Sequence, residues 1–540
     1  MERHIEKLLP HVQVPVRYTG GEINVCRKPH GDARVKFALC YPDLYEVGMS
    51  SLGIRIIYGL LNEIDGVVCE RVFCPEKDME DLLKKNKNPL FTLESKEPVK
   101  NFDVLGFSVS SELNYTNVLN VLELSEIPVL RSERKEGDPL VIAGGNCIFN
   151  FAPLSAFIDC FAVGEGEEVI PEITEVLKEK KGGKREDIIA ALSKIEGVYA
   201  PAFPAETVKK RFVKNFDASF FPVKWLVPLT EVIHDRISLE IMRGCGQGCF
   251  FCQAGSCWRP VRTRSVETLA EIARQAYKNT GYEEFSLLSF SSGDHPEIER
   301  IFEKLLRDFA GRKVTLSFPS IRIDTFSFEL AARTKEIKKT ALTFAPETGE
   351  SLRFRIGKKI KDGELTELAR KARAGGWRQI KLYFMLGLPG EEDSDILDAA
   401  RLINELSKIL SVKAAFNTFI PKPHTVFERR RFITAEEYLF KKRLLVENVW
   451  RNRHIRLTFH PYEMSRTETL LGRGDESLCA VIKRVREKGG MRENWDEHFR
   501  PSVWEESFRE ENMDVSAYLG ELKQDVLPWH KINIKMTSSI

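Results

Sequence analysis

Short apolar segments alternate with amphipathic segments along most of this chain, and this alternation restricts the fold more than any other feature. In the first third, the apolar segments have the length of buried strands and are bounded by glycine, proline or charged residues: VKFALCYP, VVCERVF, VLGFSVSS, PLVIAGG and CFAVGEG. Helical patterns lie among them, as in SSLGIRIIYGLLNEI and NYTNVLNVLEL. Buried strands that alternate with helices indicate a parallel, doubly wound sheet. We therefore expect a Rossmann-like (flavodoxin-like) α/β domain over residues 25–205.

The alternation resumes near residue 230 and predicts a second α/β unit. Its apolar segments are ISLEIMRG, EFSLLSFSS, VTLSFPSIRID, ALTFAPET, IKLYFMLGLPG and VKAAFNTFIPKP. Amphipathic segments such as SVETLAEIARQAYKN separate them. These strand and helix units are too few for a complete eight-fold barrel. We expect a partial (β/α)6 TIM-like barrel over residues 230–455, whose strands end at a shared site.

The remaining segments complete the predicted organisation. We expect an N-terminal extension over residues 1–24, a linker over 206–229 and a small, mainly helical C-terminal tail over 456–540. The length of 540 residues agrees with roughly three domains. Trp495 and Trp504 lie in the tail, and we expect them to anchor it to the barrel.

Charge and hydropathy argue against several classes of protein. The chain has 81 basic and 79 acidic residues, a net charge of +2, so no global field marks a binder of nucleic acid or of a membrane surface. Its first residues, MERHIEKLLPHVQVPVRY, contain no apolar signal core, and no later stretch is long and apolar enough to span a membrane. We expect a cytoplasmic protein whose 11 cysteines form no disulfide framework.

Three cysteines in the stretch RGCGQGCFFCQ, residues 243–253, stand apart from the others. Cys245, Cys249 and Cys252 follow the first predicted barrel strand, and catalytic groups of such barrels lie at the carboxyl ends of the strands. The intervening glycines let the loop bend so that three thiolates bind an iron-sulfur cluster and leave one iron for another ligand. Two alternatives remain. One is a zinc site with Cys257 as the fourth ligand, at a spacing that suits zinc motifs badly, and the other is chance clustering.

This C-x3-C-x2-C loop resembles the signature of radical S-adenosylmethionine (SAM) enzymes, and the resemblance covers about residues 230–455. It implies that the three cysteines hold a [4Fe-4S] cluster and that the amino and carboxylate groups of SAM chelate the open iron. It also implies reductive cleavage of SAM to methionine and a 5′-deoxyadenosyl radical. The electron would come from a donor such as flavodoxin or ferredoxin.

The same resemblance implies SAM contacts at the ends of the other barrel strands. After the second strand, SSGD stands where the family has a Gly-Gly-Glu-like turn, with serines in place of the glycines. For the other positions, except the glycines, the alternative is an ordinary polar residue of the barrel mouth. The implied SAM-binding residues are Ser291, Ser292, Gly293, Asp294, Ser320, Arg322, Glu347, Lys381, Gly387 and Pro421.

The N-terminal domain resembles a cobalamin-binding domain in the loops that follow its strands. The motif D-x-H-x-x-G of such domains stands here as D-x-Y-x-x-G, and S-x-L and Gly-Gly elements follow in the expected order. A neutral phenol is a poor cobalt ligand, so we expect that no protein histidine coordinates cobalt. The tail of cobalamin would lie in a channel that the glycines and Ser111 line. The implied cobalamin-binding residues are Asp43, Tyr45, Gly48, Ser111, Leu113, Gly144, Gly145, Gly164 and Glu165. A flavodoxin-like domain that binds no ligand or another nucleotide is the alternative.

Together the two resemblances identify the chain as a member of the cobalamin-binding radical SAM family. They imply a C-methyltransferase that uses a [4Fe-4S] cluster, SAM and cobalamin. The alternatives are a cobalamin-dependent radical cyclase, rearrangement or sulfur-insertion enzyme and, in another class, an iron-sulfur or cobalamin-responsive regulatory or RNA-binding protein. The substrate stays open among small molecules, lipids, peptides and RNA.

Overall fold

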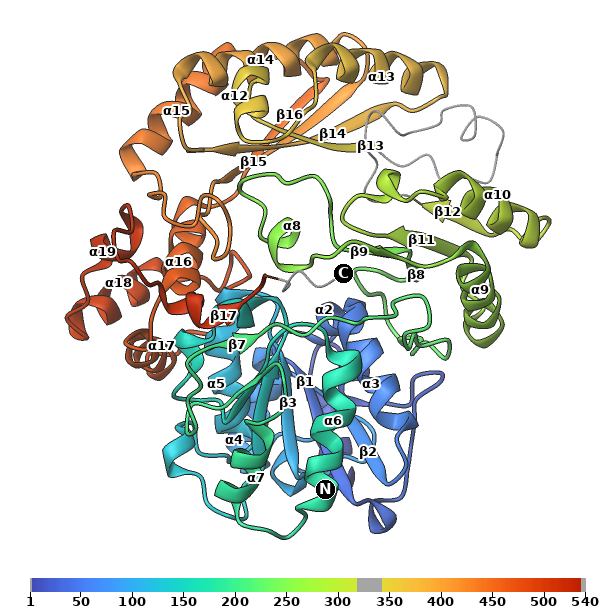
Figure 1. The fold of residues 1–540 in the computed structure, drawn as a ribbon, viewed down its shortest axis with the longest axis vertical. Coiled ribbons are helices and arrows are strands. Elements are labelled where there is room, and N and C mark those ends of the chain that lie inside the picture. The colour runs from blue at the N-terminus through green and yellow to red at the C-terminus, as the bar shows by residue number, and fades with distance from the viewer. Residues whose placement is uncertain (1, 318–341, 536–540) are drawn as a thin grey trace.

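A computed structural model describes residues 2–317 and 342–535 of the chain. Figure 1 shows the N-terminal sheet with its helices at the bottom, the barrel strands above it and the C-terminal helices along one side. The predicted strand over VTLSFPSIRID is described only in its first part. Ser320 and Arg322 lie outside the described residues.

The N-terminal domain is built on one six-stranded sheet with the order β2-β1-β3-β4-β5-β6. Its strands are β1 (Val35–Tyr41), β2 (Val67–Phe73), β3 (Val104–Ser108), β4 (Leu140–Gly144), β5 (Cys160–Ala162) and β6 (Val198–Tyr199). All neighbours pair in parallel except β6, which runs antiparallel to β5. The order 2-1-3-4-5 is that of flavodoxin-like sheets, so the predicted doubly wound fold is confirmed.

Helices cover both faces of this sheet. On one face, α3 (Leu52–Glu63) and α6 (Gly166–Glu179) share a core with alternate residues of β1. On the other face lies α5 (Tyr115–Leu124), which packs with the remaining residues of β1. Strands covered on both faces need apolar side chains at consecutive positions, which explains the uninterrupted apolar runs in the sequence.

The barrel region contains two parallel sheets within the described residues. The first has the order β12-β11-β8, from β8 (Ile237–Glu240), β11 (Glu284–Leu288) and β12 (Thr315–Ser317). The second has the order β13-β14-β15-β16, from β13 (Leu342–Glu347), β14 (Gln379–Leu386), β15 (Ser411–Thr418) and β16 (Ile455–Phe459). All six predicted strand positions are strands. The sequence pattern missed β16, which pairs with β15, and we therefore propose a barrel limit after Phe459 rather than at residue 455.

The C-terminal tail is helical and lies against the N-terminal domain. Its helices are α16 (Tyr462–Arg473), α17 (Leu478–Glu487), α18 (Pro501–Glu510) and α19 (Val515–Leu519). Helix α5 is buried at nine of its ten residues, and α17 packs against it. Trp504 belongs to the same core, and the indole Nε1 of Trp495 donates to Asp43 Oδ1 at 3.0 Å. The expectation that these tryptophans anchor the tail to the barrel is therefore wrong. They hold the tail against the N-terminal domain, because the apolar face of α5 is buried by the tail helices.

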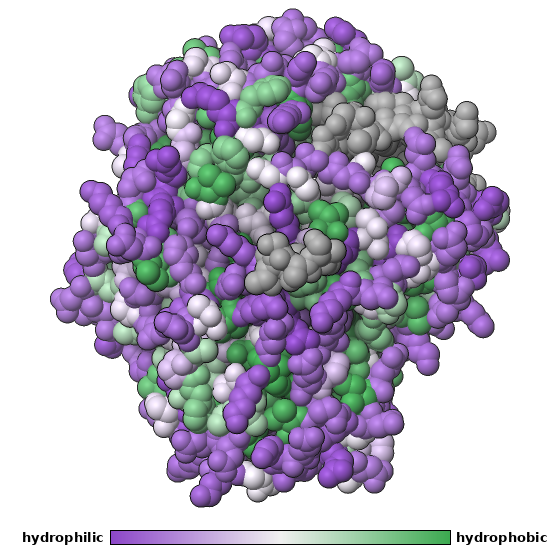
Figure 2. All heavy atoms as spheres, viewed as in Figure 1, coloured by the Kyte–Doolittle hydropathy of each residue, from purple (hydrophilic) through white to green (hydrophobic). Residues whose placement is uncertain are grey.

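The outer surface is largely polar. Figure 2 shows mostly hydrophilic residues on the visible face, in keeping with a charged content of 30%. Within the described residues, no helix combines the length and the apolar character that crossing a bilayer requires.

Candidate functional site

The cysteine loop follows β9 (Met242–Arg243), at the carboxyl end of the first barrel strand. Gly244 has φ +89°, and a Cβ there would lie 2.6 Å from the carbonyl oxygen of Trp258, so only glycine fits this turn. Cys245 is buried, and Cys252 caps helix α8 (Gln253–Cys257), its Sγ accepting from Gly255 N at 3.3 Å. Cys245 therefore lies in a tight turn, and Cys252 lies at the start of a helix.

Apolar contacts hold this loop against the second barrel sheet. The backbone N–H of Phe250 donates to the carbonyl of Ile356 at 3.0 Å, just after helix α12 (Glu350–Arg355). Phe250 also meets Phe427 edge to face, at 5.8 Å between ring centroids. With Phe251 it packs on a small core of Leu352, Ile356, Leu388, Phe419 and Phe427. The cysteine loop thus bridges the two sheets of the partial barrel.

The three cysteine thiols lie close enough to influence one another electrostatically. Burial raises the pKa of Cys249 to about 11, opposed by Lys358 and reinforced by the nearby Cys252 and Cys245, so the three sulfurs share one electrostatic environment. Among the described residues, no three His, Cys, Asp or Glu side chains group closely enough to hold one ion. A [4Fe-4S] cluster takes each thiolate at a different iron and so suits more widely spaced thiols. Cys257 is fully buried in the core shared with the N-terminal domain, where burial raises its pKa to about 12.

An ion pair that the sequence did not reveal lies beside the cysteines. Lys358 Nζ donates to Glu347 Oε1 at 2.6 Å. Glu347 ends β13 with φ +71° and is buried, and this burial raises its pKa, although Lys358 acts in the opposite direction. The family resemblance implies a SAM contact for Glu347. It implies none for Lys358, which lies in the run GKKIK, a pattern typical of a surface turn.

The SSGD turn lies next to the cysteine loop. Asp294 Oδ2 accepts from Gln247 Nε2 at 2.6 Å, so a side chain of the cysteine loop fixes the acidic residue of the turn. The hydroxyls of Ser289 and Ser292 bond each other at 2.8 Å. Ser291 Oγ is buried and has no hydrogen-bond partner among the residues that the structure describes, which leaves a polar atom available for a ligand. These positions agree with the predicted SAM roles, which stay predictions.

The other predicted SAM residues are spread along the barrel. Gly387 directly follows β14, where its N–H donates to Glu391 Oε2 at 2.8 Å, and Pro421 is buried after β15. Lys381 lies near the start of β14, six residues before Gly387 and about 20 Å from it along the chain. The SAM roles of both residues stay predictions.

A cavity of about 350 Å³ lies between the N-terminal sheet and helices α3 and α6. Its wall on the sheet side consists of small residues, among them Gly106, Gly144, Ala162 and Gly164. A Cβ on Gly106 would have no neighbour nearer than 3.9 Å, so the missing side chain leaves real space. On the barrel side the cavity reaches Glu240, Arg243, Trp258, Leu288 and Phe290. It therefore connects the carboxyl ends of the N-terminal strands with the strand that leads into the cysteine loop.

The structure divides the predicted cobalamin residues into two groups. Gly144, Gly145, Gly164 and Glu165 line the cavity. The residues that do not line it are Asp43, Tyr45, Gly48, Ser111 and Leu113.

The second group makes contacts elsewhere. The hydroxyl of Tyr45 donates to Glu22 Oε1 at 2.9 Å, inside a buried network in which Arg71 also binds Glu22. Ser111 Oγ bonds Asn494 Oδ1 at 2.8 Å, and Asp43 accepts from the Trp495 indole. The tail loop thus covers these two motifs. No pattern in the N-terminal sequence indicates this contact.

A buried ionic network joins the cavity to the barrel. Glu165 accepts from Arg262 at 2.5 and 2.7 Å and lies 3.1 Å from Arg243, two residues before Cys245. Burial tends to raise the pKa of Glu165, but the bonds from Arg262 and the charge of Arg243 outweigh it and hold the pKa below its usual value. Arg243 also pairs with Glu167 and Glu240. This network fixes the N-terminal domain to the start of the cysteine loop.

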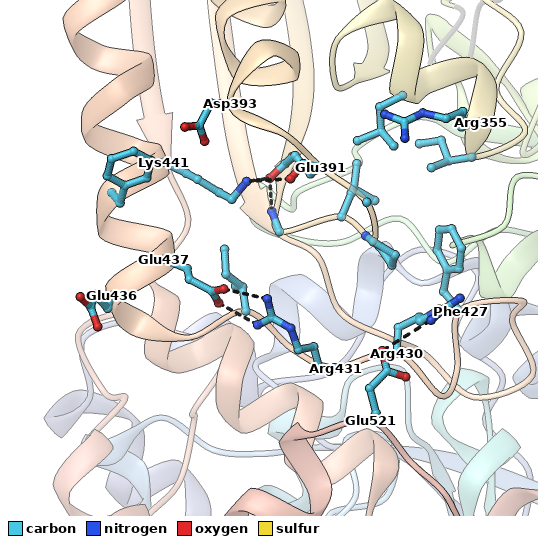
Figure 3. Close-up of a pocket in the computed structure, with 18 of the residues that line it drawn as sticks. Arg355, Glu391, Asp393, Phe427, Arg430, Arg431, Glu436, Glu437, Lys441 and Glu521 are labelled. Atoms are coloured by element: carbon cyan, nitrogen blue, oxygen red, sulfur yellow. Dashed lines mark hydrogen bonds and ion pairs between the residues drawn. The ribbon is translucent and has the colours of Figure 1, made fainter.

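A larger cleft of about 1120 Å³ lies on the outer side of the cysteine loop, with Phe250 in its wall. Its charges are mostly paired with one another. Figure 3 shows Arg431 against Glu437 and Lys441 against Glu391, with bonds of 2.7 and 3.0 Å. Of the residues predicted to bind SAM, Gly387 lines this cleft.

Comparison with known proteins assigns the two α/β regions. Residues 53–201 match the family model of the N-terminal region of radical SAM proteins, and residues 239–403 match the model of the radical SAM superfamily. The curated protein MJ0966 of Methanocaldococcus jannaschii, which carries the description "uncharacterized", is 28% identical over 452 residues, covering 82% of this chain and 90% of that protein.

Two solved structures share most of the fold. The radical SAM methyltransferase TsrM from Kitasatospora setae, solved with cobalamin and a [4Fe-4S] cluster, has a TM-score of 0.55 at 12% identity and covers 89% of this chain and 99% of its own. The cobalamin-dependent radical SAM enzyme OxsB, solved with aqua-cobalamin and SAM, has a TM-score of 0.51 at 11% identity and covers 88% of this chain and 71% of its own.

These matches and the cysteine loop define a radical SAM enzyme, whose domain implies a [4Fe-4S] cluster and SAM. The chain belongs to the radical SAM superfamily, and it shares its overall fold with the cobalamin-dependent members TsrM and OxsB.

Proposed function

We propose that the protein is a cobalamin-dependent radical SAM C-methyltransferase. The observation that carries the proposal is the cavity that extends from the glycine-lined strands of the N-terminal sheet to Arg243 and Trp258, which flank the cysteine loop. Such a cavity allows a cofactor held by the N-terminal domain to meet the product of SAM cleavage at the barrel mouth. TsrM, which has the same fold, is a methyltransferase.

The lining of the cavity suits the tail of cobalamin. Ile56, Ile57 and Ile170 provide apolar walls, and the glycines of β3 and β4 leave room beside the sheet. None of the described residues that line the cavity is a histidine. Tyr45 is committed to Glu22, and burial raises its pKa further above the ordinary value of a phenol. We infer that cobalamin would bind without a cobalt ligand from Tyr45 or from a histidine.

The residues of the barrel would hold the other two cofactors, the cluster and SAM. Cys245, Cys249 and Cys252 would bind the cluster, and Phe250 and Phe251 would limit the access of water to it. Ser291 and Asp294 of the SSGD turn and Glu347 at the end of β13 would bind polar groups of SAM. When bound, these groups would supply a carbon-centred radical and a methyl group. The protein would orient the substrate between the two domains.

Two further expectations belong to this proposal. The cluster would receive its electron from a flavodoxin- or ferredoxin-like protein, and the enzyme would act in the cytoplasm. The requirement for an electron donor follows from membership of the superfamily.

Anaerobic purification of the full chain, reconstitution of the cluster and addition of cobalamin test the proposal. With reductant and SAM, we expect 5′-deoxyadenosine and, because a second SAM would methylate cobalamin by polar transfer, S-adenosylhomocysteine as well. Formation of 5′-deoxyadenosine alone, with cobalamin bound, would contradict methyl transfer. Nitrogen coupling from a protein histidine in the spectrum of bound cob(II)alamin would contradict the inferred binding mode.

A further inference from the structure

Three cations lie side by side on neighbouring strands of the second barrel sheet. The strand register pairs Lys381 of β14 with Lys413 of β15, and Lys413 with Arg456 of β16. Neighbouring strands lie about 4.8 Å apart, so the three residues form one continuous row across the sheet. We call Lys381, Lys413 and Arg456 the basic row.

The basic row faces the inside of the partial barrel. Along β14, buried residues alternate with half-exposed ones, and the buried Ile380 and Leu382 share a core with helices α13 (Asp362–Ala374) and α14 (Asp393–Ser407). The side chains of the row alternate with these core residues and so point to the other face, away from the helices. Lys413 and Arg456 are exposed there.

Polar groups follow the row toward the barrel mouth on the same face. They are Tyr383 on β14, Asn417 on β15 and Thr458 on β16. Asn417 and Thr458 are exposed, so the inner face of these strands is not filled by core side chains. This face offers several hydrogen-bonding groups between the basic row and the strand ends, together with the apolar Ala415 and Met385.

The basic row lacks the acidic partners that most cations in this protein have. Within residues 2–317 and 342–535, Lys381, Lys413 and Arg456 form no ion pair and no side-chain hydrogen bond; Lys381 Nζ only lies over the Tyr383 ring, 4.7 Å from its centroid. Like charges on directly neighbouring strands destabilise a sheet. Three cations kept in register, with no acidic partner among residues 2–317 and 342–535, form a site suited to an external anion.

We propose that the basic row binds a phosphate group of the substrate. The inference rests on the proposed function, and it names the substrate class as a phosphorylated small molecule. Phosphate carries nearly two negative charges and several acceptor oxygens, which suits three adjacent cations better than a single carboxylate does. Arg456 can bind two of these oxygens at once, and the lysines add point charges.

The position of the row also sets the length of this substrate. Lys381 precedes Leu386, the last residue of β14, by five residues, which corresponds to about 16 Å. The substrate would therefore place its phosphate deep in the barrel and its reacting carbon at the mouth, beside the cysteine loop. A tail of this length allows the basic row to orient the substrate without contact with the reacting atoms.

Binding of inorganic pyrophosphate to the full chain tests the proposal, with calorimetry and thermal melting as measurements. We compare the wild type with Lys413→Gln, Arg456→Gln and, as a control, Lys85→Gln, which removes an exposed lysine of the N-terminal domain. Each change in the row should weaken pyrophosphate binding by about tenfold, because one charge-assisted bond is lost. The control should bind like the wild type. Without pyrophosphate, Lys413→Gln should melt at the temperature of the wild type or above it, because the change relieves repulsion.

Three outcomes would overturn the inference. Equal binding by the wild type and Lys413→Gln would show that pyrophosphate binds elsewhere, and equal weakening by Lys85→Gln would show a general charge effect. Tighter binding of an RNA oligonucleotide than of pyrophosphate, lost in Lys413→Gln, would assign the row to a nucleic acid instead. Formation of 5′-deoxyadenosine by Lys413→Gln, measured in parallel, keeps this result separate from the proposed function. That activity should persist when pyrophosphate binding is lost.

Discussion

Strand β2 of the N-terminal sheet is buried at all seven positions, whereas β14 of the barrel alternates buried and half-exposed residues. Both sheets are parallel apart from the edge strand β6, but helices cover both faces of the first and, among the described residues, only one face of the second. The N-terminal sheet can accept a ligand only where glycines replace side chains, as at Gly106 and Gly144. The barrel sheet leaves part of its inner face exposed, at Lys413, Asn417, Arg456 and Thr458, and these residues are polar. The N-terminal sheet thus makes room for a ligand where side chains are missing, whereas the barrel sheet offers polar side chains on an exposed part of its face.

The two sites meet where Glu165 forms ion pairs with Arg243 and Arg262, and we call these three residues the junction. Glu165 belongs to the N-terminal domain and lies next to the cavity. It binds Arg243 and Arg262, which belong to the barrel region. The comparison predicts that each site can be disabled without the other, whereas damage to the junction affects the whole molecule. The following variants separate these cases.

Cys245→Ala should have the largest effect, and it should be confined to the barrel. Removal of one cluster ligand should lower the formation of 5′-deoxyadenosine by at least about a thousandfold, because the remaining thiols hold the cluster poorly. Cobalamin content, measured from the absorption spectrum after reconstitution, should stay at the wild-type level. Cys479→Ala, which removes a thiol from the tail, is the control. Undiminished SAM cleavage by Cys245→Ala would refute the assignment of the cluster.

Glu165→Ala should destabilise the protein by about 3 kcal/mol, because the buried Arg262 loses its carboxylate partner and Arg243 loses one of its three. Arg243 and Arg262 are 9% and 10% exposed at the side chain, so water replaces the lost carboxylate poorly. Denaturant unfolding of the full chain measures the loss. Glu172→Ala is the matched control, since Glu172 is 46% exposed and its pair with Arg211 should contribute less than about 1 kcal/mol. Equal losses in the two variants would show that the junction is no more important than the surface.

Gly106→Val should disable the N-terminal site alone. The nearest atom to a Cβ at this position is 3.9 Å away, so the strand tolerates valine while the side chain enters the cavity. Overpacking of about 1–3 kcal/mol against a bound tail corresponds to a loss of cobalamin affinity of up to about a hundredfold. SAM cleavage should continue. Gly363→Ala, in open space on α13, serves as the control. Wild-type affinity in Gly106→Val would place cobalamin outside the cavity.

The regular parts of this fold were predictable from the sequence. Apolar runs and glycine turns gave the doubly wound sheet and the six barrel strand positions, since both follow from local pattern. Strand β16 was missed because it is a sheet edge whose residues are all half-exposed or exposed, so it has no buried run.

The site was predictable only where the motif is local. The cysteine loop lies within eight residues, and its placement at the strand end needed no tertiary information. Lys358 reaches Glu347 only through the fold, and its neighbours in sequence resemble a surface turn. Asp43 and Ser111 carry cobalamin-like motifs, yet residues of the tail, more than 380 positions away, occupy their hydrogen bonds. Sequence motifs cannot show which distant segment covers them.

Glu493→Gln should have the smallest effect, and it tests how the tail covers the N-terminal sheet. Glu493 is fully buried, and this burial raises its pKa to about 7 from 4.5. The unfolded chain therefore loses its proton before the folded protein does, so this carboxyl lowers stability as the pH rises from about 4.5 to about 7. Above pH 7 the variant should be more stable than the wild type by about 2 kcal/mol, and the difference should vanish near pH 4.5. Denaturant unfolding at both pH values measures this change, with Glu497→Gln in the same tail loop as the control. A difference that does not depend on pH would mean that Glu493 is ionised in the folded protein. Water would then reach the tail loop, and this loop would not cover the N-terminal sheet as the structure shows.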